Sequence, residues 1–134
     1  MTVFAIIEPA RQSTVMVDCE FDEAKQHAKL GNVDHGVVLK LETLTIGIAV
    51  YEFSLYVPPE KQSYFAINGK LYAGNAIVYA EDESGPIDLP DIPKVAFMPG
   101  VSAVERSIAL GLVERPQLLV DGLVIWQWPQ PCPP

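Results

Sequence analysis

Two dipeptides, Asn68-Gly69 and Asp121-Gly122, constrain the fold of this chain most, because each stands between two apolar runs. Asn-Gly and Asp-Gly readily adopt the positive φ angles that a two-residue type I′ turn requires at both central positions. We therefore expect two β-hairpins, and we expect the strand after Asn68-Gly69 to continue as far as Ala80. Adjacent hairpins pair antiparallel, so the fold is expected to be rich in antiparallel sheet.

The run "TIGIAVYEFSLYV" is a further strand in which the apolar face changes partway. Ile46, Ile48 and Val50 share one side, whereas Tyr51 and Phe53 share the other. A strand cannot keep one inner face through such a switch, so either both faces are covered or a bulge lies near Val50 and Tyr51. Tyr51 and Phe53 become candidates for an interface if a second subunit provides the cover.

Two segments have helical signals. Residues 21–31 begin with Asp22 as a possible cap and end at Gly31, and their thin apolar face predicts a helix on the surface of a sheet. Residues 102–111 begin with an S-x-x-E capping box formed by Ser102 and Glu105. The predicted fold is α+β, a mainly antiparallel sheet in one or two layers with two short helices. Residues 1–129 form one globular domain, and residues 130–134 are an extended Pro-rich tail.

Composition excludes several classes of function. The net charge is −8 and the nine basic residues are scattered, which argues against nucleic-acid binding and against a membrane-surface role. The longest apolar run, residues 45–57, contains Glu52 and is too short to cross a bilayer. No basic segment precedes the first apolar residues, so a cytoplasmic protein without a signal peptide is expected. Cys19 and Cys132 form no paired motif and are expected to be free thiols.

No dinucleotide-binding, P-loop or serine-hydrolase motif is present, so no cofactor is implied. Cys19 with His27 and His35 suggests a zinc site or a Cys–His nucleophile, but the three residues lack ligand spacing. The acidic stretch "EDESGPIDLPD" lacks the order of a calcium loop. The sequence favours a solvated turn for this stretch over a row of carboxylates that imitates nucleic-acid phosphates.

A small ligand pocket is the main alternative to an interaction surface. Asn75 lies in the apolar run "YAGNAIVY", where a buried amide requires a hydrogen-bond partner. A backbone partner is favoured over a ligand. The candidate pocket residues are Tyr72, Asn75, Asp88 and Asp91.

The last hairpin carries the strongest candidates for protein contact. Trp126 and Trp128 share one face of its second strand, and Pro129 follows them. One interpretation places both rings in the core, but tryptophan is also enriched at the centre of protein interfaces. With no catalytic set present, we expect a non-enzymatic interaction protein that binds a protein partner, forms a homo-oligomer, or both. It would act as an accessory protein, a regulator, an inhibitor or an assembly component.

Two alternatives remain open, a small-molecule- or metal-binding domain with hydrolytic activity and an acidic inhibitor that mimics nucleic acid. In its small size, its acidity and the stretches "FAIIEP" and "AGNAIVY", the chain resembles small proteins of phages and plasmids. That resemblance assigns no role to any residue.

Overall fold

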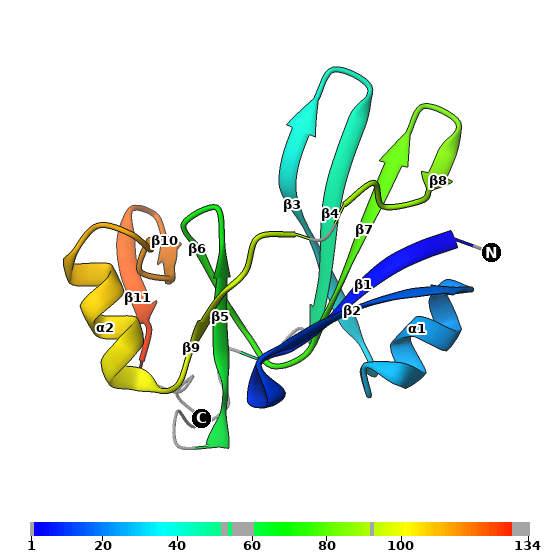
Figure 1. The fold of residues 1–134 in the computed structure, drawn as a ribbon. Coiled ribbons are helices and arrows are strands. Elements are labelled where there is room, and N and C mark those ends of the chain that lie inside the picture. The colour runs from blue at the N-terminus through cyan, green and yellow to red at the C-terminus, as the bar shows by residue number, and fades with distance from the viewer. Residues whose placement is uncertain (1, 52–53, 55–60, 92, 130–134) are drawn as a thin grey trace.

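A computed structural model describes residues 2–51, 54, 61–91 and 93–129 of the chain (Figure 1). Within these residues the protein is mainly antiparallel β-sheet with two α-helices, so the predicted α+β class is confirmed. The main β-sheet forms two packed layers, within the one or two expected, and a further layer covers the outer face of each sheet. From one side to the other the layers are a helix, a six-stranded sheet, a three-stranded sheet, and a layer made of the second helix and the last hairpin.

The larger sheet has the strand order β2-β1-β7-β4-β3, and β8 pairs with the C-terminal end of β7. All its pairings are antiparallel. A 3₁₀ turn, Pro9–Arg11, joins the first two strands. The strands are β1 (Thr2–Glu8), β2 (Ser13–Cys19), β3 (Val33–Leu41), β4 (Leu44–Tyr51), β7 (Ala76–Asp82) and β8 (Gly85–Ile87).

The smaller sheet contains β5 (Tyr64–Ile67), β6 (Lys70–Ala73) and β9 (Ala96–Met98), in the order β6-β5-β9. Asn68 and Gly69 have φ angles of 52° and 76°, which confirms the predicted hairpin turn. The prediction that its second strand continues to Ala80 is wrong. Gly74 has a φ of 75° and its N–H donates to the Ser63 carbonyl at 2.9 Å, so the chain turns there and β7 joins the larger sheet.

Apolar residues fill both sides of each sheet. Ile48 of β4 packs toward the smaller sheet, whereas its neighbour Ala49 packs toward the first helix, so both faces of β4 are covered. The register of β3 and β4 shifts between Val37 and Leu39, which places the irregularity in β3 and not near Val50. All four residues of β5 are buried, because the smaller sheet lies between the larger sheet and the C-terminal layer.

Helix α1 (Phe21–His27) lies on the outer face of the larger sheet, as predicted, through the fully buried Ala24. Its N-cap is Glu20, whose side chain does not cap the helix, so Asp22 is not the cap. The C-terminal end of α1 also differs from the prediction, which placed it at Gly31. Lys29 has a φ of 57°, and the N–H groups of Lys29 and Leu30 donate to the carbonyls of Gln26 and Lys25. This is a Schellman motif with lysine where glycine is usual.

Lys29→Gly is therefore expected to raise the free energy of unfolding by a few tenths to about 1 kcal/mol, because glycine adopts positive φ without steric cost. Gly31→Ala is expected to be neutral, because a Cβ at Gly31 would meet no atom within 4 Å. Urea unfolding of both variants tests this pair. If Gly31 were the true stop, Gly31→Ala would be the damaging change and Lys29→Gly would gain nothing.

Helix α2 (Val101–Ala109) does not use the predicted capping box. Its N-cap is Gly100, and no side chain caps it. Glu105 turns instead to Arg115, ten residues later in the chain. The predicted end at Gly111 is confirmed, because Gly111 has a φ of 74° and its N–H donates to the Ile108 carbonyl at 3.0 Å.

Candidate interaction surface

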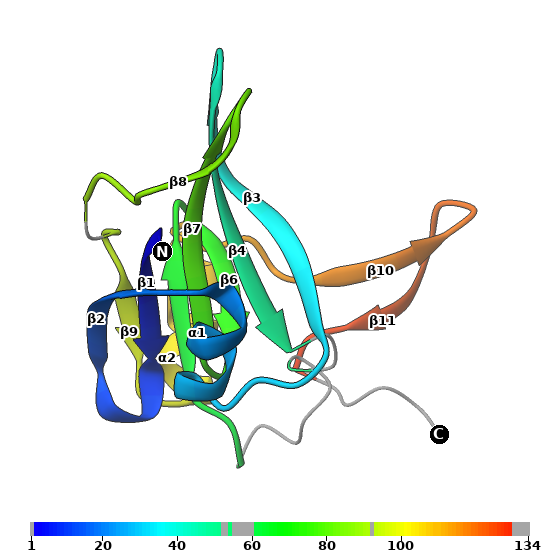
Figure 2. The same cartoon turned by 90° about the vertical axis from the view of Figure 1, so that its right-hand side faces the viewer.

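The C-terminal hairpin is formed by β10 (Gln117–Val120) and β11 (Leu123–Gln127). Asp121 and Gly122 have φ angles of 50° and 80°, so the second predicted turn is also confirmed. The two strands extend away from the rest of the chain (Figure 2). We refer to residues 117–127 as the arm.

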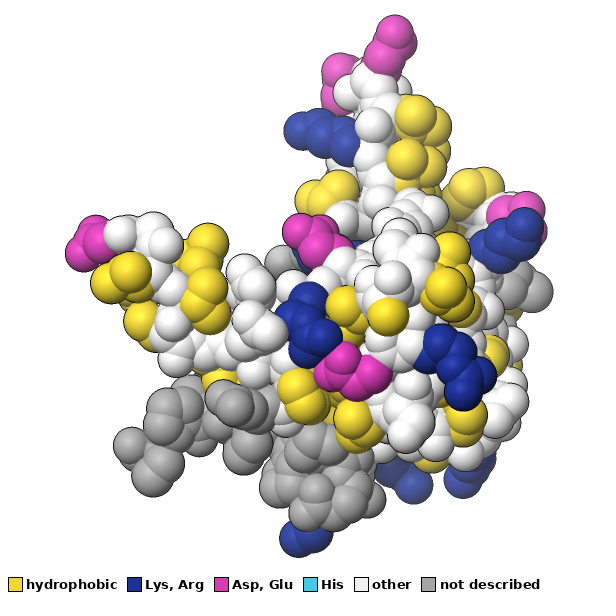
Figure 3. Space-filling view, turned by 90° about the vertical axis from the view of Figure 1, so that its left-hand side faces the viewer, with side chains coloured by type: hydrophobic (Ala, Val, Ile, Leu, Met, Phe, Trp, Pro, Cys, Tyr) yellow, Lys and Arg dark blue, Asp and Glu magenta, His cyan; other side chains and the backbone are white. Residues whose placement is uncertain are grey.

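Large apolar side chains stand on both faces of the arm. Val120 pairs with Leu123, and Leu119 pairs with Val124. Paired residues share a face and successive pairs alternate, so these two pairs point in opposite directions. Figure 3 shows hydrophobic side chains gathered along the arm. Six of them are between 42% and 70% exposed: Leu118, Leu119, Val120, Leu123, Val124 and Ile125.

The base of the arm, in contrast, is deeply buried. Trp126 is 6% exposed and Trp128 is fully buried. The Trp128 ring meets the Tyr64 ring edge to face, with centroids 5.5 Å apart. Both indoles belong to the cluster that packs between the smaller sheet and α2. The arm is thus an extension of the core, held at one end and apolar at the other.

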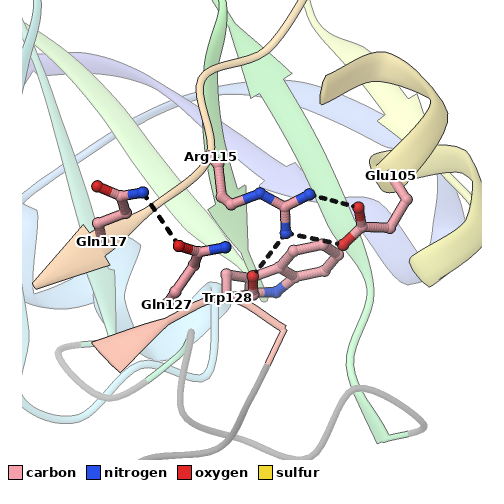
Figure 4. Close-up of polar contacts among 5 residues, drawn as sticks. All are labelled: Glu105, Arg115, Gln117, Gln127 and Trp128. Carbon is pink, nitrogen blue, oxygen red and sulfur yellow. Dashed lines mark hydrogen bonds and ion pairs between the residues drawn. The ribbon is translucent and has the colours of Figure 1, made fainter. Parts of the chain in front are cut away.

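Arg115 fixes the base by a second means (Figure 4). Its guanidinium donates to both carboxylate oxygens of Glu105, at 2.6 Å and 3.1 Å, and also to the Trp128 carbonyl at 2.8 Å. This bidentate pair is only partly exposed and links the arm to α2. Bonding to Glu105 outweighs desolvation and raises the pKa of Arg115. The Gln117 amide also donates to Gln127 across the strands at 3.1 Å.

A groove of about 500 Å³ runs between β6 and the base of the arm. Leu71, Leu118 and Trp126 supply apolar surface to it. Lys70, Glu114 and Arg115 supply charge of both signs. The groove therefore continues the exposed surface of the arm toward the body of the protein.

The residues predicted to form an interface are distributed differently from the expectation. Trp126 and Trp128 anchor the arm and do not present their rings on its surface. Pro129 is half-buried beside them, and Tyr51 is 41% exposed at the end of β4. Phe53 lies outside the described residues. That the last hairpin contacts a partner stays a prediction, but the side chains available for contact are its six exposed aliphatic residues.

The predicted ligand-pocket residues do not share one cavity. Tyr72 is buried between the sheets and stacks on Phe65 at 5.4 Å, and burial raises the pKa of its phenol. The Asn75 amide donates to the Ala28 carbonyl at 2.9 Å, the backbone role that the sequence favoured. The Asp88 carboxylate accepts the Val3 N–H at 2.9 Å. Asp91 lines a separate hollow of about 220 Å³.

The acidic stretch forms a local turn. The Asp82 carboxylate accepts the N–H and the hydroxyl of Ser84, at 2.8 Å and 2.6 Å. These bonds lower the pKa of Asp82. Among the described residues, no three His, Cys, Asp or Glu side chains come together as a metal site. Cys19 is buried against α1, whereas His35 bonds the Tyr79 hydroxyl.

Cys19 is expected to be unreactive in the folded protein, because burial and the nearby Glu23, Asp18 and Glu20 raise the pKa of its thiol. In a Cys132→Ser background, Ellman's reagent should label Cys19 slowly without urea and rapidly with it. The folded pKa lies above the unfolded one, so the unfolded thiol ionises first as pH rises. Stability should therefore fall above about pH 8.5, and more steeply than in the Cys19→Ala, Cys132→Ser double variant.

No protein-family model, no curated protein and no solved structure matches the chain. No helix within the described ranges is long and apolar enough to cross a membrane.

The sequence of the arm also indicates apolar side chains on both of its faces. The runs "LLV" and "LVI" are continuously apolar and do not alternate, which is typical of a strand with apolar residues on both faces.

Proposed function

We propose that this chain is a non-enzymatic protein-interaction protein that binds its partner through the arm. One observation carries the proposal: six large aliphatic side chains are exposed on both faces of a hairpin whose base is fixed in the core. Together they present on the order of several hundred Å² of apolar surface, divided between the two faces of the arm, and exposed apolar patches of this order are often functional. The partner is a protein with an apolar groove, either a different chain or a second copy.

The fixed base supports a binding role, because an arm that is already oriented loses little conformational entropy on binding. The Arg115–Glu105 pair and the two buried indoles restrict the arm before any partner arrives. Asp121 at the turn is the one charged residue of the arm, so −7 of the net charge of −8 resides elsewhere. Contact through the arm should therefore depend little on ionic strength.

The test is a pair of isosteric substitutions with a matched control. Val120→Thr with Val124→Thr adds a hydroxyl to each face of the arm and keeps high strand propensity. Val15→Thr on β2 is the control, because Val15 is 49% exposed and the two arm valines are 50% and 51% exposed. Light scattering of the purified proteins detects self-association, and capture from nuclease-treated lysate of the host at two salt concentrations detects other partners.

We expect the arm variant to lose its partner or its oligomer, with an affinity lower by about tenfold, while Val15→Thr behaves as wild type. Retention of the wild-type partner at high salt supports apolar contact. Loss at high salt would favour the acidic mimic instead. If wild type, arm variant and control share one oligomeric state and one capture profile, the arm is not the contact surface.

A further inference from the structure

A second cleft lies on the opposite outer layer of the molecule, where α1 covers the larger sheet. Its volume is about 190 Å³. Aromatic side chains dominate its lining, and they come from four different elements: β1, α1, β3 and β7. The lining residues are Phe4, Phe21, His35, Tyr79, Glu81 and Pro86.

The Tyr79 ring lies flat against the sheet because the residue opposite it on the adjacent strand is a glycine. Tyr79 pairs with Gly47 of β4, and a Cβ at Gly47 would lie within 2.6 Å of its Cε2 and hydroxyl oxygen. The phenol reaches across β4 to β3, where its oxygen lies 2.9 Å from Nδ1 of His35. One face of the ring therefore packs on the backbone, which leaves the other face for the cleft.

Three ring pairs at the cleft are close to perpendicular, whereas the planes of Phe21 and His35 differ by 31°, with centroids 6.0 Å apart. The Tyr79 ring meets Phe21 at 85° and His35 at 72°, with centroids 6.2 Å and 5.7 Å apart. Phe4 meets Phe21 at 76°, with centroids 5.8 Å apart. A cation attracted to an aromatic face lies within about 6 Å of the ring centroid. A small cation in the cleft would satisfy this distance for more than one ring at a time.

The charge at the cleft has the sign that a cation requires. Glu81 follows Tyr79 by two residues on β7, so both side chains share one face of the strand. Burial, and secondarily the Glu81 carboxylate, raise the pKa of Tyr79. Among the residues that the structure describes, no lysine or arginine lines the cleft. Aromatic ring faces with one carboxylate beside them are suited to an ammonium group that carries methyl groups.

We propose that this cleft binds a small organic cation of the quaternary ammonium class, with its N-methyl groups against Phe21 and Tyr79 and its charge beside Glu81. The shape of the cleft accounts for the methyl groups, and the carboxylate accounts for the charge. The inference does not depend on the arm, which belongs to the opposite outer layer.

The test compares choline with 3,3-dimethyl-1-butanol, which has the same shape but no charge. Each is titrated into the ¹⁵N-labelled full chain at constant ionic strength. We expect saturable shifts in the amides of residues 21, 35 and 79, with choline binding at least fivefold more tightly than the alcohol. Equal affinities, or saturable shifts elsewhere only, would overturn the proposal. A trimethyllysine peptide separates two sources of the same group: tighter binding than choline indicates a protein-borne cation, and equal binding indicates a free one.

Two variants and a matched control test the assigned residues. Phe21→Leu removes a ring but keeps apolar bulk, and Glu81→Gln removes the charge at an exposed position. Both should weaken choline binding several-fold. Glu83 is an exposed acid on the turn that follows β7 and does not line the cleft, so Glu83→Gln should leave choline binding unchanged. Should Phe21→Leu fail to fold, Glu81→Gln still decides the matter. An unchanged choline affinity in Glu81→Gln, or an equal loss in Glu83→Gln, contradicts the assigned site.

Discussion

Replacing Trp128 with alanine is expected to lower the free energy of unfolding by about 3–5 kcal/mol, the range for deleting a buried aromatic side chain. Trp128 is the largest fully buried side chain among the described residues. It fills the space between the smaller sheet and α2 and contacts Tyr64 edge to face. Alanine would leave a cavity there and would release the base of the arm. Urea unfolding followed by circular dichroism measures the loss.

Trp128→Phe is the matched control and should cost less. Phenylalanine keeps a ring against Tyr64. It also removes the indole N–H, which is buried and has no hydrogen-bond partner in the described part of the chain. Leaving a buried donor unsatisfied is costly, so its removal offsets part of the lost packing. If the free energy of unfolding of Trp128→Ala lies within about 1 kcal/mol of the wild-type value, the stability of this layer does not depend on the indole.

Gly47→Ala is expected to destabilise the protein by about 1–3 kcal/mol, the usual cost of adding a methyl group where no space exists. The new Cβ would collide with the Tyr79 ring, which packs directly on Gly47. Either the ring leaves its position or the strands separate. Urea unfolding measures the cost, and loss of the choline-dependent shifts would report that the ring has moved.

A double-mutant cycle shows whether Tyr79 is the cause. Tyr79→Ala should remove the collision, so Gly47→Ala should cost nearly nothing in that background, and the coupling energy should be of the same size as the single effect. Gly36→Ala is the control on the neighbouring strand. A Cβ there would meet only Ile48, at an ordinary contact distance of 3.6 Å. Additive effects of Gly47→Ala and Tyr79→Ala would contradict the packing described for this ring.

The features that were predicted correctly from the sequence each depend on only a few neighbouring residues. Asn68-Gly69, Asp121-Gly122 and the helix stop at Gly111 each depend on local φ preferences, and the structure confirms all three. The failures have distant causes. The capping box failed because Glu105 pairs with Arg115 across the turn that follows α2. The end of α1 was misplaced because Lys29 adopts a conformation that sequence rules assign to glycine.

The candidate surfaces were less predictable, because they depend on which layer covers which strand. The hairpin pattern around Asp121 is the same whether its aliphatic side chains are covered or exposed. The burial of Trp128 depends on Tyr64, sixty-four residues away along the chain. The aromatic cleft joins Phe4 with Tyr79, and no local pattern connects two such distant positions. Sequence reasoning predicted the hairpin itself, but it proposed contact through Trp126 and Trp128, which the structure buries.

The sandwiched position of the smaller sheet has a consequence for the order of events during translation. Residues 2–98 contain all strands of both main sheets, yet the layer that covers the outer face of β5 and β6 comes from residues 101–128. A nascent chain that has just completed β9 thus exposes Tyr64, Ala66 and Met98 to solvent. Domains fold as they emerge from the ribosome, at about 5–20 residues per second. Synthesis therefore includes an interval in which an apolar sheet is uncovered, and chaperone binding would be most useful during that interval.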